Sequence, residues 1–292
     1  MSNNHSGCDT EKNMIRGGCL YLVATPIGNL SDITERALKV LSEVDFIAAE
    51  DTRNSLRLLT HFGISKPLIS YFEHNKRERG SIIAERLIAG ESCALITDAG
   101  TPAISDPGED LVRLCAEQNI PVFSVPGACA AICALTLSGL NTSRFCFEGF
   151  LPTAKSERKQ RLEALKSEER TVIFHEAPHK LKSTLSDLAT AFGPERQIAL
   201  CRELTKLNEQ TLRTTLGGAM EYYETEQPRG EYVLVIAGAE TSEKKCFWES
   251  MTVEEHLEYY INTGMERRDA IKTVAHDRGV PKNDIYKKAI RD

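Results

Sequence analysis

The sequence lacks the segments and motifs that define several large classes of protein. No apolar run approaches the roughly 20 residues that a membrane-spanning helix needs. We expect residues 1–18 to be a leader, and it is polar, without the apolar core of a secretory signal. Neither the Gly-x-x-x-x-Gly-Lys-Ser/Thr pattern of P-loop enzymes nor the Gly-x-Gly-x-x-Gly pattern of dinucleotide-binding enzymes occurs. These absences argue against a membrane protein, a secreted protein and both nucleotide-binding classes, and we expect a cytoplasmic protein.

Disulfide and metal-binding patterns are also missing. Nine cysteines are scattered along the chain without any Cys-x-x-Cys pair. Cys129 and Cys133 would share one helical face, but no histidine is near them in the sequence. Segment 175–179 holds two histidines and a glutamate, but Pro178 interrupts the helix that a His-Glu-x-x-His site requires. We therefore expect no metal site, and buried thiols in the reduced state.

The composition is that of a globular protein with more than one domain. Hydrophobic residues make up 41% and charged residues 27% of the 292 residues, and a domain usually has about 150 residues. The net charge of −6 argues against a nucleic-acid-binding surface over the whole molecule, but it permits a local basic patch.

The first half of the chain alternates short apolar runs with amphipathic segments. We expect strands at 19–24, 44–49, 67–71, 93–96 and 121–125, each followed by a helix. Ser31 or Asp32 is the expected N-cap of the first helix, with Glu35 in a capping box. The helix at 128–140 is apolar enough to be deeply buried. This alternation predicts a mainly parallel sheet with helices on both faces over residues 19–147.

Glycine, proline and ionisable residues gather where these strands end. The longest such stretch, 97–108, holds two glycines, two prolines and two aspartates. Because the carboxyl ends of parallel strands lie at one edge of a sheet, we expect these loops to form one ligand cleft. The Gly/Pro loops contain no lysine. A triphosphate would find little positive charge there, so a cationic or zwitterionic ligand, such as a methionine-derived sulfonium with adenine and ribose, fits better.

Several ionisable side chains at the strand ends have two interpretations. Glu50, Asp51 and Arg53 form either an acid–base cluster or a helix N-cap with a surface ion pair. His74 is either a general base or a polar residue in a structural hydrogen bond. Lys206 follows a strand in the second half and could direct positive charge at the cleft from the other side.

The second half is less regular. Residues 147–155 are expected to link the two halves, and residues 148–239 to form a smaller domain with a mixed sheet and strands at 171–174, 197–201 and 232–237. Residues 240–292 predict three short helices in a helix-turn-helix-like unit, and eight positive against five negative residues follow position 264. Both nucleic-acid contact and a solvated helical cap are consistent with that charge.

Seven segments together resemble one known family. They are LVATPIGNL (22–30), AEDTR (49–53), TDAGTPAISDPG (97–108), SVPG (124–127), FCFEGFLP (145–152), FHEAPH (174–179) and RELTK (202–206). In this order they resemble the bacterial small-subunit ribosomal RNA methyltransferases of the tetrapyrrole-methylase superfamily. Two positions differ from the usual family pattern, because Ala24 stands where proline is frequent and His175 where tyrosine is common. The resemblance extends over residues 19–239, and the helical tail is also similar.

The resemblance implies S-adenosylmethionine bound between two α/β domains, usually in a homodimer, and 2′-O-methylation of a cytidine in the decoding centre of 16S rRNA in the small ribosomal subunit. The implied cofactor contacts are Pro26, Asp98, Ala99, Gly100, Ile104, Cys129, Ala130, Phe174, His175 and Leu204. For catalysis we expect Glu50 or Asp51 as the base and Arg53 on a phosphate or the nascent oxyanion, with His74 and Lys206 as second choices. The expected contacts to RNA phosphates are Lys155, Arg158, Lys159, Arg161 and the tail.

Two other functions are compatible with the same segments. One is a small-molecule methyltransferase of the superfamily that acts on a tetrapyrrole. The other is a non-catalytic rRNA-binding module that has lost methyl transfer. The basic helical tail and segments 49–53 and 147–152 favour an RNA substrate over the tetrapyrrole, and the intact cofactor loops argue against the non-catalytic module.

Overall fold

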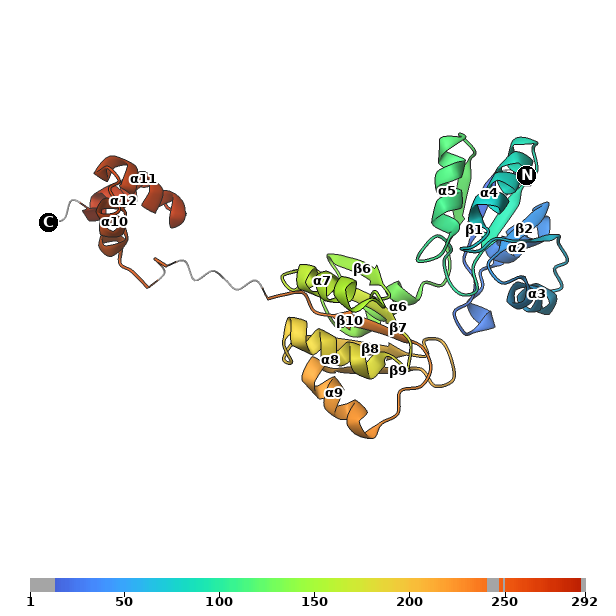
Figure 1. The fold of residues 1–292 in the computed structure, drawn as a ribbon. Coiled ribbons are helices and arrows are strands. Elements are labelled where there is room, and N and C mark those ends of the chain that lie inside the picture. Colours follow the sequence, from blue (N-terminus) through green and yellow to red (C-terminus); the bar gives the residue numbers. More distant parts are fainter. Residues whose placement is uncertain (1–13, 241–246, 249, 290–292) are drawn as a thin grey trace, which may run out of the picture. The chain divides into compact units, whose positions relative to one another are not determined.

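The computed structural model describes residues 14–240, 247–248 and 250–289. The chain divides into two compact units, residues 1–239 and 240–292, and each is described by itself (Figure 1). Within the described residues, no helix has both the length and the apolar character needed to span a membrane.

The first half of the larger unit contains a five-stranded sheet in which all neighbours are parallel. Its strands are β1 (Leu20–Val23), β2 (Phe46–Ala49), β3 (Leu68–Ser70), β4 (Cys93–Ile96) and β5 (Val122–Val125). Their order across the sheet is β3-β2-β4-β1-β5. The predicted parallel sheet is therefore confirmed, and the loops after β1 and β4 leave the same edge from adjacent strands.

Helices cover both faces of this sheet, as the alternating pattern predicts. Helices α2 (Glu35–Glu43) and α3 (Thr52–His61) share a buried cluster with Tyr21 and Val23 of β1. Helices α4 (Lys76–Ile88) and α5 (Gly108–Glu117) share another with Leu20. Successive residues of β1 thus point to opposite cores, which is the two-residue periodicity of a strand buried on both sides.

The expected start of α2 is wrong. Thr34 is its N-cap, and the Thr34 hydroxyl accepts a hydrogen bond from the backbone N–H of Ala37 at 3.1 Å. The expected caps Ser31 and Asp32 lie in a short 3-10 helix, η1 (Leu30–Asp32), that Asn29 caps. Several residues in a row had side chains suited to capping, and only the path of the backbone decides which of them takes the role.

The second half of the larger unit contains a mixed five-stranded sheet, which confirms the predicted sheet type. Its strands are β6 (Phe145–Gly149), β7 (Thr171–Glu176), β8 (Gln197–Arg202), β9 (Gln210–Thr215) and β10 (Tyr232–Ile236). Their order is β6-β7-β10-β8-β9, and only the β6–β7 pair is parallel. Strands β6 and β9 were not expected, and β6 takes up the first part of the expected linker.

Helices also cover both faces of the second sheet. One face packs against α7 (Lys155–Leu165), α8 (Leu181–Phe192) and α9 (Leu216–Thr225). The other face packs against α6 (Ala130–Ser138). The prediction that this apolar helix is deeply buried holds for one face only, because Ala134 and Leu135 are buried whereas Ile132 and Leu137 are 44% and 36% exposed.

The smaller unit is a cluster of three helices, α10 (Val253–Asn262), α11 (Arg267–Asp277) and α12 (Lys282–Ala289). Thr252 and Glu255 form a capping box at the start of α10. A four-residue turn, 278–281, joins α11 to α12. The core contains Leu257, Ile271 and Ile285, so the unit has its own buried apolar centre.

Candidate functional site

The loops that follow β1 and β4 are joined by backbone hydrogen bonds. The Thr25 N–H donates to the Gly100 carbonyl at 2.9 Å, and the Gly100 N–H donates to the Thr25 carbonyl at 3.1 Å. The Thr25 hydroxyl donates to the Thr97 carbonyl at 3.2 Å. Thr101 extends this to the loop after β5, because its hydroxyl donates to the Ala128 carbonyl at 3.0 Å. Hydrogen bonds thus hold together the loops that follow three strands, β1, β4 and β5.

Asp106 holds the loop after β4 in an unusual conformation. Its carboxylate accepts hydrogen bonds from the backbone N–H groups of Ala103, Ile104 and Gly108 at 3.0, 3.2 and 2.8 Å. Ala103 and Ser105 have positive φ angles of 66° and 64°, which residues other than glycine rarely adopt. Such backbone persists only where its surroundings enforce it, and it occurs most often at ligand-binding sites.

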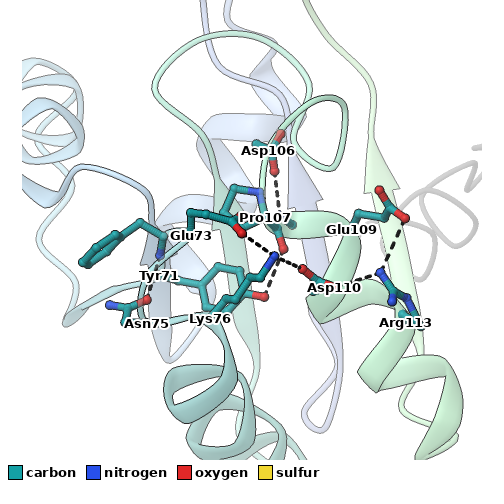
Figure 2. Close-up of polar contacts among 11 residues, drawn as sticks. Tyr71, Glu73, Asn75, Lys76, Asp106, Pro107, Glu109, Asp110 and Arg113 are labelled. Carbon is teal, nitrogen blue, oxygen red and sulfur yellow. Dashed lines mark hydrogen bonds and ion pairs between the residues drawn. The ribbon is translucent and has the colours of Figure 1, made fainter. Parts of the chain in front are cut away.

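A polar network connects the loop after β3 to the start of α5 (Figure 2). The Lys76 ammonium lies 2.7 Å from a carboxylate oxygen of Glu73 and 2.6 Å from one of Asp110. Hydrogen bonds to these two groups raise the pKa of Lys76, and Lys76 lowers the pKa of Asp110. The Tyr71 hydroxyl donates to the Pro107 carbonyl at 3.0 Å, and burial raises the pKa of Tyr71 to about 12. The network therefore fixes the loop that carries His74.

The second half of the unit reaches this edge through the loop after β8. A β-carbon added to Gly28 would lie 2.4 Å from Cγ of Lys206 and 3.0 Å from Oγ1 of Thr205. A β-carbon added to Gly149 would lie 3.1 Å from Oγ of Ser105. All three distances are shorter than ordinary van der Waals contact, so loops from the two sheets meet closely, and glycine is needed at position 28 to allow this approach.

Three buried polar atoms in this region have no hydrogen-bond partner among the described residues. They are Nε2 of His175, Nε of Arg202 and Oγ1 of Thr205. The His175 ring contacts the rings of Phe147 and Phe150, with centroids 5.1 and 5.6 Å away, and burial lowers the pKa of His175. Thr205 itself has a φ of 65°. Buried polar groups are nearly always satisfied in folded proteins, so these atoms are suited to a polar ligand.

The structure gathers most of the expected cofactor residues around these loops. Pro26, Asp98, Ala99, Gly100 and Ile104 lie on the loops after β1 and β4, Cys129 and Ala130 at the start of α6, and His175 and Leu204 on the facing second sheet and its loop. Phe174 is the exception. Its side chain is 1% exposed and belongs to the core under α7, α8 and α9, so only its backbone is available on the side of α6.

The expected catalytic residues occupy different environments. The Glu50 carboxylate accepts a hydrogen bond from the Thr97 hydroxyl at 2.9 Å, beside Asp98. Asp51 is the N-cap of α3 and accepts from the backbone N–H of Arg53 at 2.8 Å. The Arg53 Nε lies 3.8 Å from the Asp51 carboxylate, and the arginine side chain is 90% exposed. Asp51 and Arg53 thus match the structural alternative of an N-cap with a surface ion pair.

The two second-choice residues differ in their contacts. The Lys206 ammonium is 2.9 Å from a carboxylate oxygen of Glu203 and 2.9 Å from one of Glu231. Burial would lower the pKa of Lys206, but the two carboxylates outweigh it and raise the pKa. A lysine held in its charged form cannot serve as a base. His74 is exposed, and its ring is nearly perpendicular to that of Phe72, with centroids 6.2 Å apart.

A pocket of about 400 Å³ opens beside Asp98. It is lined by the β1 loop, the end of β4 and one face of α3, through Pro26, Gly28, Leu30, Asn54, Ser55, Arg57, Leu58, His61, Thr97 and Asp98. The α3 residues were not among the site residues predicted from the sequence. The signal was present, since positions 54, 57, 58 and 61 follow the spacing of a single helical face.

The four expected phosphate contacts on α7 divide into two pairs. Lys155 and Lys159 are exposed. Arg158 is not available as expected, because it donates to the Asp187 carboxylate at 2.6 Å and to the Thr184 hydroxyl at 2.8 Å. Arg161 is also engaged, in a pair of hydrogen bonds with the Glu148 carboxylate at 2.6 and 2.7 Å.

The cysteines that the structure describes are all free, and its described residues contain no group of three or more His, Cys, Asp or Glu side chains able to hold a metal ion.

Comparison with known sequences gives one family and a group of similar proteins. The sequence profile of the tetrapyrrole (corrin/porphyrin) methylases matches residues 19–219. A protein named ribosomal RNA small subunit methyltransferase I from Halalkalibacterium halodurans is 49% identical, over 92% of this chain and 93% of its own. Proteins of the same name from Synechocystis and Escherichia coli O157:H7 are 49% and 42% identical, over 92% and 94% of this chain and 96% and 95% of theirs.

Solved structures share the fold at low sequence identity. Uroporphyrin-III-C-methyltransferase from Thermus thermophilus aligns with a TM-score of 0.54 at 19% identity, over 76% of this chain and 95% of its own. A diphthine synthase aligns with a TM-score of 0.58 at 13% identity, over 75% of this chain and 90% of its own. Another structure of the Thermus thermophilus enzyme, at 16% identity and a TM-score of 0.53 over 74% and 96% of the two chains, holds S-adenyl homocysteine. These likenesses establish the two-domain α/β fold.

Proposed function

Because this chain belongs to the tetrapyrrole (corrin/porphyrin) methylase family, among the ribosomal RNA small subunit methyltransferase I proteins, we propose that it methylates the 2′-oxygen of a cytidine in the decoding centre of 16S rRNA. The observation that carries this proposal is an identity of 42–49% with proteins of that name over at least 92% of the chain. The proposed partners are 16S rRNA, within the small ribosomal subunit in the cytoplasm, and a second copy of this chain in a homodimer.

S-adenosylmethionine is the proposed methyl donor, and the described residues fit it. The unpartnered Nε2 of His175 and Oγ1 of Thr205 can bind polar groups of a ligand between the two sheets. Pro26, Asp98–Gly100, Ile104 and the start of α6 would hold it from the other side. When bound, the cofactor supplies an electrophilic methyl group on a positively charged sulfur.

The protein must then place a ribose hydroxyl against that methyl group and remove its proton. A 2′-hydroxyl is a weak nucleophile, so holding it in line at close range contributes several kcal/mol to the rate. Glu50 is the proposed base, because the Thr97 hydroxyl orients its carboxylate next to Asp98. As the new C–O bond formed and the bond between the methyl carbon and sulfur broke, with its electron pair left on the sulfur, the free carboxylate oxygen of Glu50 would accept the hydroxyl proton. Asp51 is committed to the end of α3, and Lys206 stays protonated.

The experiment that tests this function is methyl transfer from labelled S-adenosylmethionine to small ribosomal subunits that lack the modification, followed by mapping of the labelled nucleotide. A single 2′-O-methylcytidine in the decoding region is the expected result. Cofactor binding without transfer to RNA would contradict the proposal and favour a small-molecule substrate such as a tetrapyrrole. Transfer to another nucleotide would contradict the proposed target, and no cofactor binding would contradict an enzymatic function.

A further inference from the structure

The pocket beside Asp98 has the position that an acceptor requires. It shares Pro26 and Asp98 with the proposed cofactor site, and Thr97, which orients Glu50, is also in its lining. Nδ2 of Asn54 on α3 is 3.5 Å from a carboxylate oxygen of Asp98, so the α3 face directly adjoins the cofactor loop. Methyl transfer needs the two reacting atoms within about 3–3.5 Å of each other, and a group in this pocket would adjoin both the donor and the base.

The pocket lining contains one arginine, Arg57, and one carboxylate, Asp98, which belongs to the proposed cofactor site. Arg57 is exposed, lines the pocket and forms no ion pair with any residue between positions 14 and 240. Arg53, one helical turn earlier, is paired with Asp51, and Lys206 is paired with two carboxylates. The planar guanidinium of an arginine binds a phosphate through two parallel hydrogen bonds. Arg57 is therefore available for a phosphate at the pocket.

The remaining lining suits a base and a ribose. Leu30 is 42% exposed at the pocket although it is apolar, and Pro26 and Leu58 add further apolar surface. The Asn54 side chain provides an amide that can both donate and accept hydrogen bonds. Single-stranded RNA is recognised by contacts of this kind, in which unstacked bases lie on flat or apolar side chains and their edges are hydrogen-bonded.

Another described pocket, which also contains an exposed arginine, Arg77, shares no lining residue with the proposed cofactor site. It is lined by Tyr71, Lys76, Asp110 and Arg113, among others, and Figure 2 shows its polar network. Lys76 is neutralised by Glu73 and Asp110, and Arg113 lies 2.7 Å from Asp110. This second pocket shares no lining residue with the pocket beside Asp98.

We infer that the pocket formed by α3 and the β1 loop receives the acceptor nucleotide of the RNA, with Arg57 bound to its phosphate. The inference rests on the proposed function and extends it to the substrate-binding residues. Arg57 is a positioning residue in this scheme, because it places the ribose between Glu50 and the methyl group without contacting the reacting atoms.

The test compares Arg57→Gln and Arg57→Lys with Arg36→Gln in the full-length chain. Arg36 is a matched control, because it is an exposed arginine on the neighbouring helix α2 and is outside the pocket lining. The measurements are kcat and KM for unmodified small subunits at several salt concentrations, and the Kd for S-adenosylmethionine by calorimetry. Loss of one charged phosphate contact is expected to raise KM by roughly 10–100-fold and to reduce the salt dependence of binding by about one unit of log–log slope.

The expected pattern is specific to a phosphate contact. Arg57→Gln shows the rise in KM with an unchanged Kd for S-adenosylmethionine, Arg57→Lys recovers part of the loss, and Arg36→Gln behaves as wild type. An unchanged KM and salt slope in Arg57→Gln, while the wild type transfers methyl groups normally, would overturn this inference alone. A parallel loss of cofactor binding would assign the pocket to the cofactor and also overturn it. If the wild-type protein transferred no methyl group to RNA, the proposed function itself would fall, and the inference with it.

Discussion

Glu50 and Asp51 are adjacent carboxylates with different roles. Both follow β2, and from the sequence either could be the base. In the structure the Glu50 carboxylate accepts from Thr97 at the pocket, whereas Asp51 caps α3 through the backbone N–H of Arg53. The difference arises because consecutive residues at a strand end point in different directions, and only one direction faces the loop after β4.

We predict that Glu50→Gln lowers the single-turnover rate of methyl transfer by about 10²–10⁴-fold, which is the usual contribution of a general base. The glutamine keeps the size of the side chain and a hydrogen-bond acceptor for Thr97, so the Kd for S-adenosylmethionine should not change. Rapid-quench measurements with saturating enzyme report the rate. Glu43→Gln, an exposed position on α2 paired with Lys39, is the matched control.

Asp51→Ala is expected to act on folding, with a loss of about 1 kcal/mol in the free energy of unfolding, as for other N-cap substitutions. Urea denaturation measures this loss. A normal rate in Glu50→Gln, together with a large rate loss in Asp51→Asn, which keeps the cap, would instead identify Asp51 as the base.

The basic residues of helix α7 lie in two different environments. Its sequence presents four cations within seven positions, and all were expected to contact RNA. Arg158 has a side chain only 14% exposed and joins α7 to α8 through Asp187 and Thr184. Arg161 donates two hydrogen bonds to the Glu148 carboxylate and so joins α7 to β6. Lys155 and Lys159 are exposed, and they remain the candidates for phosphate contact.

We predict that the double substitution Lys155→Ala/Lys159→Ala weakens binding to small ribosomal subunits and lowers the log–log salt slope by about two units. Filter binding at several salt concentrations measures both effects, and thermal unfolding should be unchanged. Arg158→Ala should instead lower the free energy of unfolding by about 1–3 kcal/mol, because it removes a hydrogen bond to the buried Thr184 hydroxyl and the ion pair with Asp187. An unaltered salt slope in the double variant would exclude this face of α7 from RNA binding.

At the scale of the whole molecule, the chain has a separate C-terminal unit with a buried histidine at its centre. The His256 side chain is fully buried, its Nδ1 accepts from Nε of Arg278 at 3.2 Å, and its ring is stacked on Trp248 with centroids 5.4 Å apart. Arg278 also donates to the carbonyls of Met251 and Thr252 at 2.7 and 2.8 Å. This tail arginine is therefore committed to the fold of the unit.

Burial, and then the charge of Arg278, lower the pKa of His256 in the folded unit, against the opposing effect of Asp277. Above the ordinary histidine value of about 6.5 both the folded and unfolded forms are neutral. As the pH falls below that value, the unfolded chain takes up a proton that the folded unit does not, so the free energy of unfolding decreases. The decrease continues until the pH reaches the lowered pKa of the folded state.

We predict that the C-terminal unit unfolds at lower urea concentration at pH 5.5 than at pH 7.5. Trp248 is the sole tryptophan of the chain, so its fluorescence reports on this unit alone. His256→Gln keeps an acceptor for Arg278 and removes the titrating group, and the difference between the two pH values should shrink in this variant. The same pH difference in both proteins would show that His256 is not its source.

Sequence patterns by themselves determined the kinds of layers in the fold and the edge where the ligand loops lie. Strands such as β4 are continuous apolar runs, and helices such as α4 have one apolar face, so local patterns identified both. The alternation of strands and helices then required a parallel sheet, which places all its C-terminal loops at one edge. The glycines, prolines and acids of residues 97–108 marked the loop that the structure shows to be held by Thr25 and Asp106.

Only the tertiary structure decided which side chains are engaged in the fold and which are available to bind a ligand. It assigned the cap of α2 to Thr34, turned Phe174 into the core, and engaged Arg158 and Arg161 while it left Arg57 at a pocket. The cap of α2 depends on the local path of the backbone, whereas the engagement of Arg158 and Arg161 depends on residues from other elements. A local pattern specifies which face of an element is apolar, but the partner of a charged or polar side chain is set by which segments the fold brings within hydrogen-bond distance.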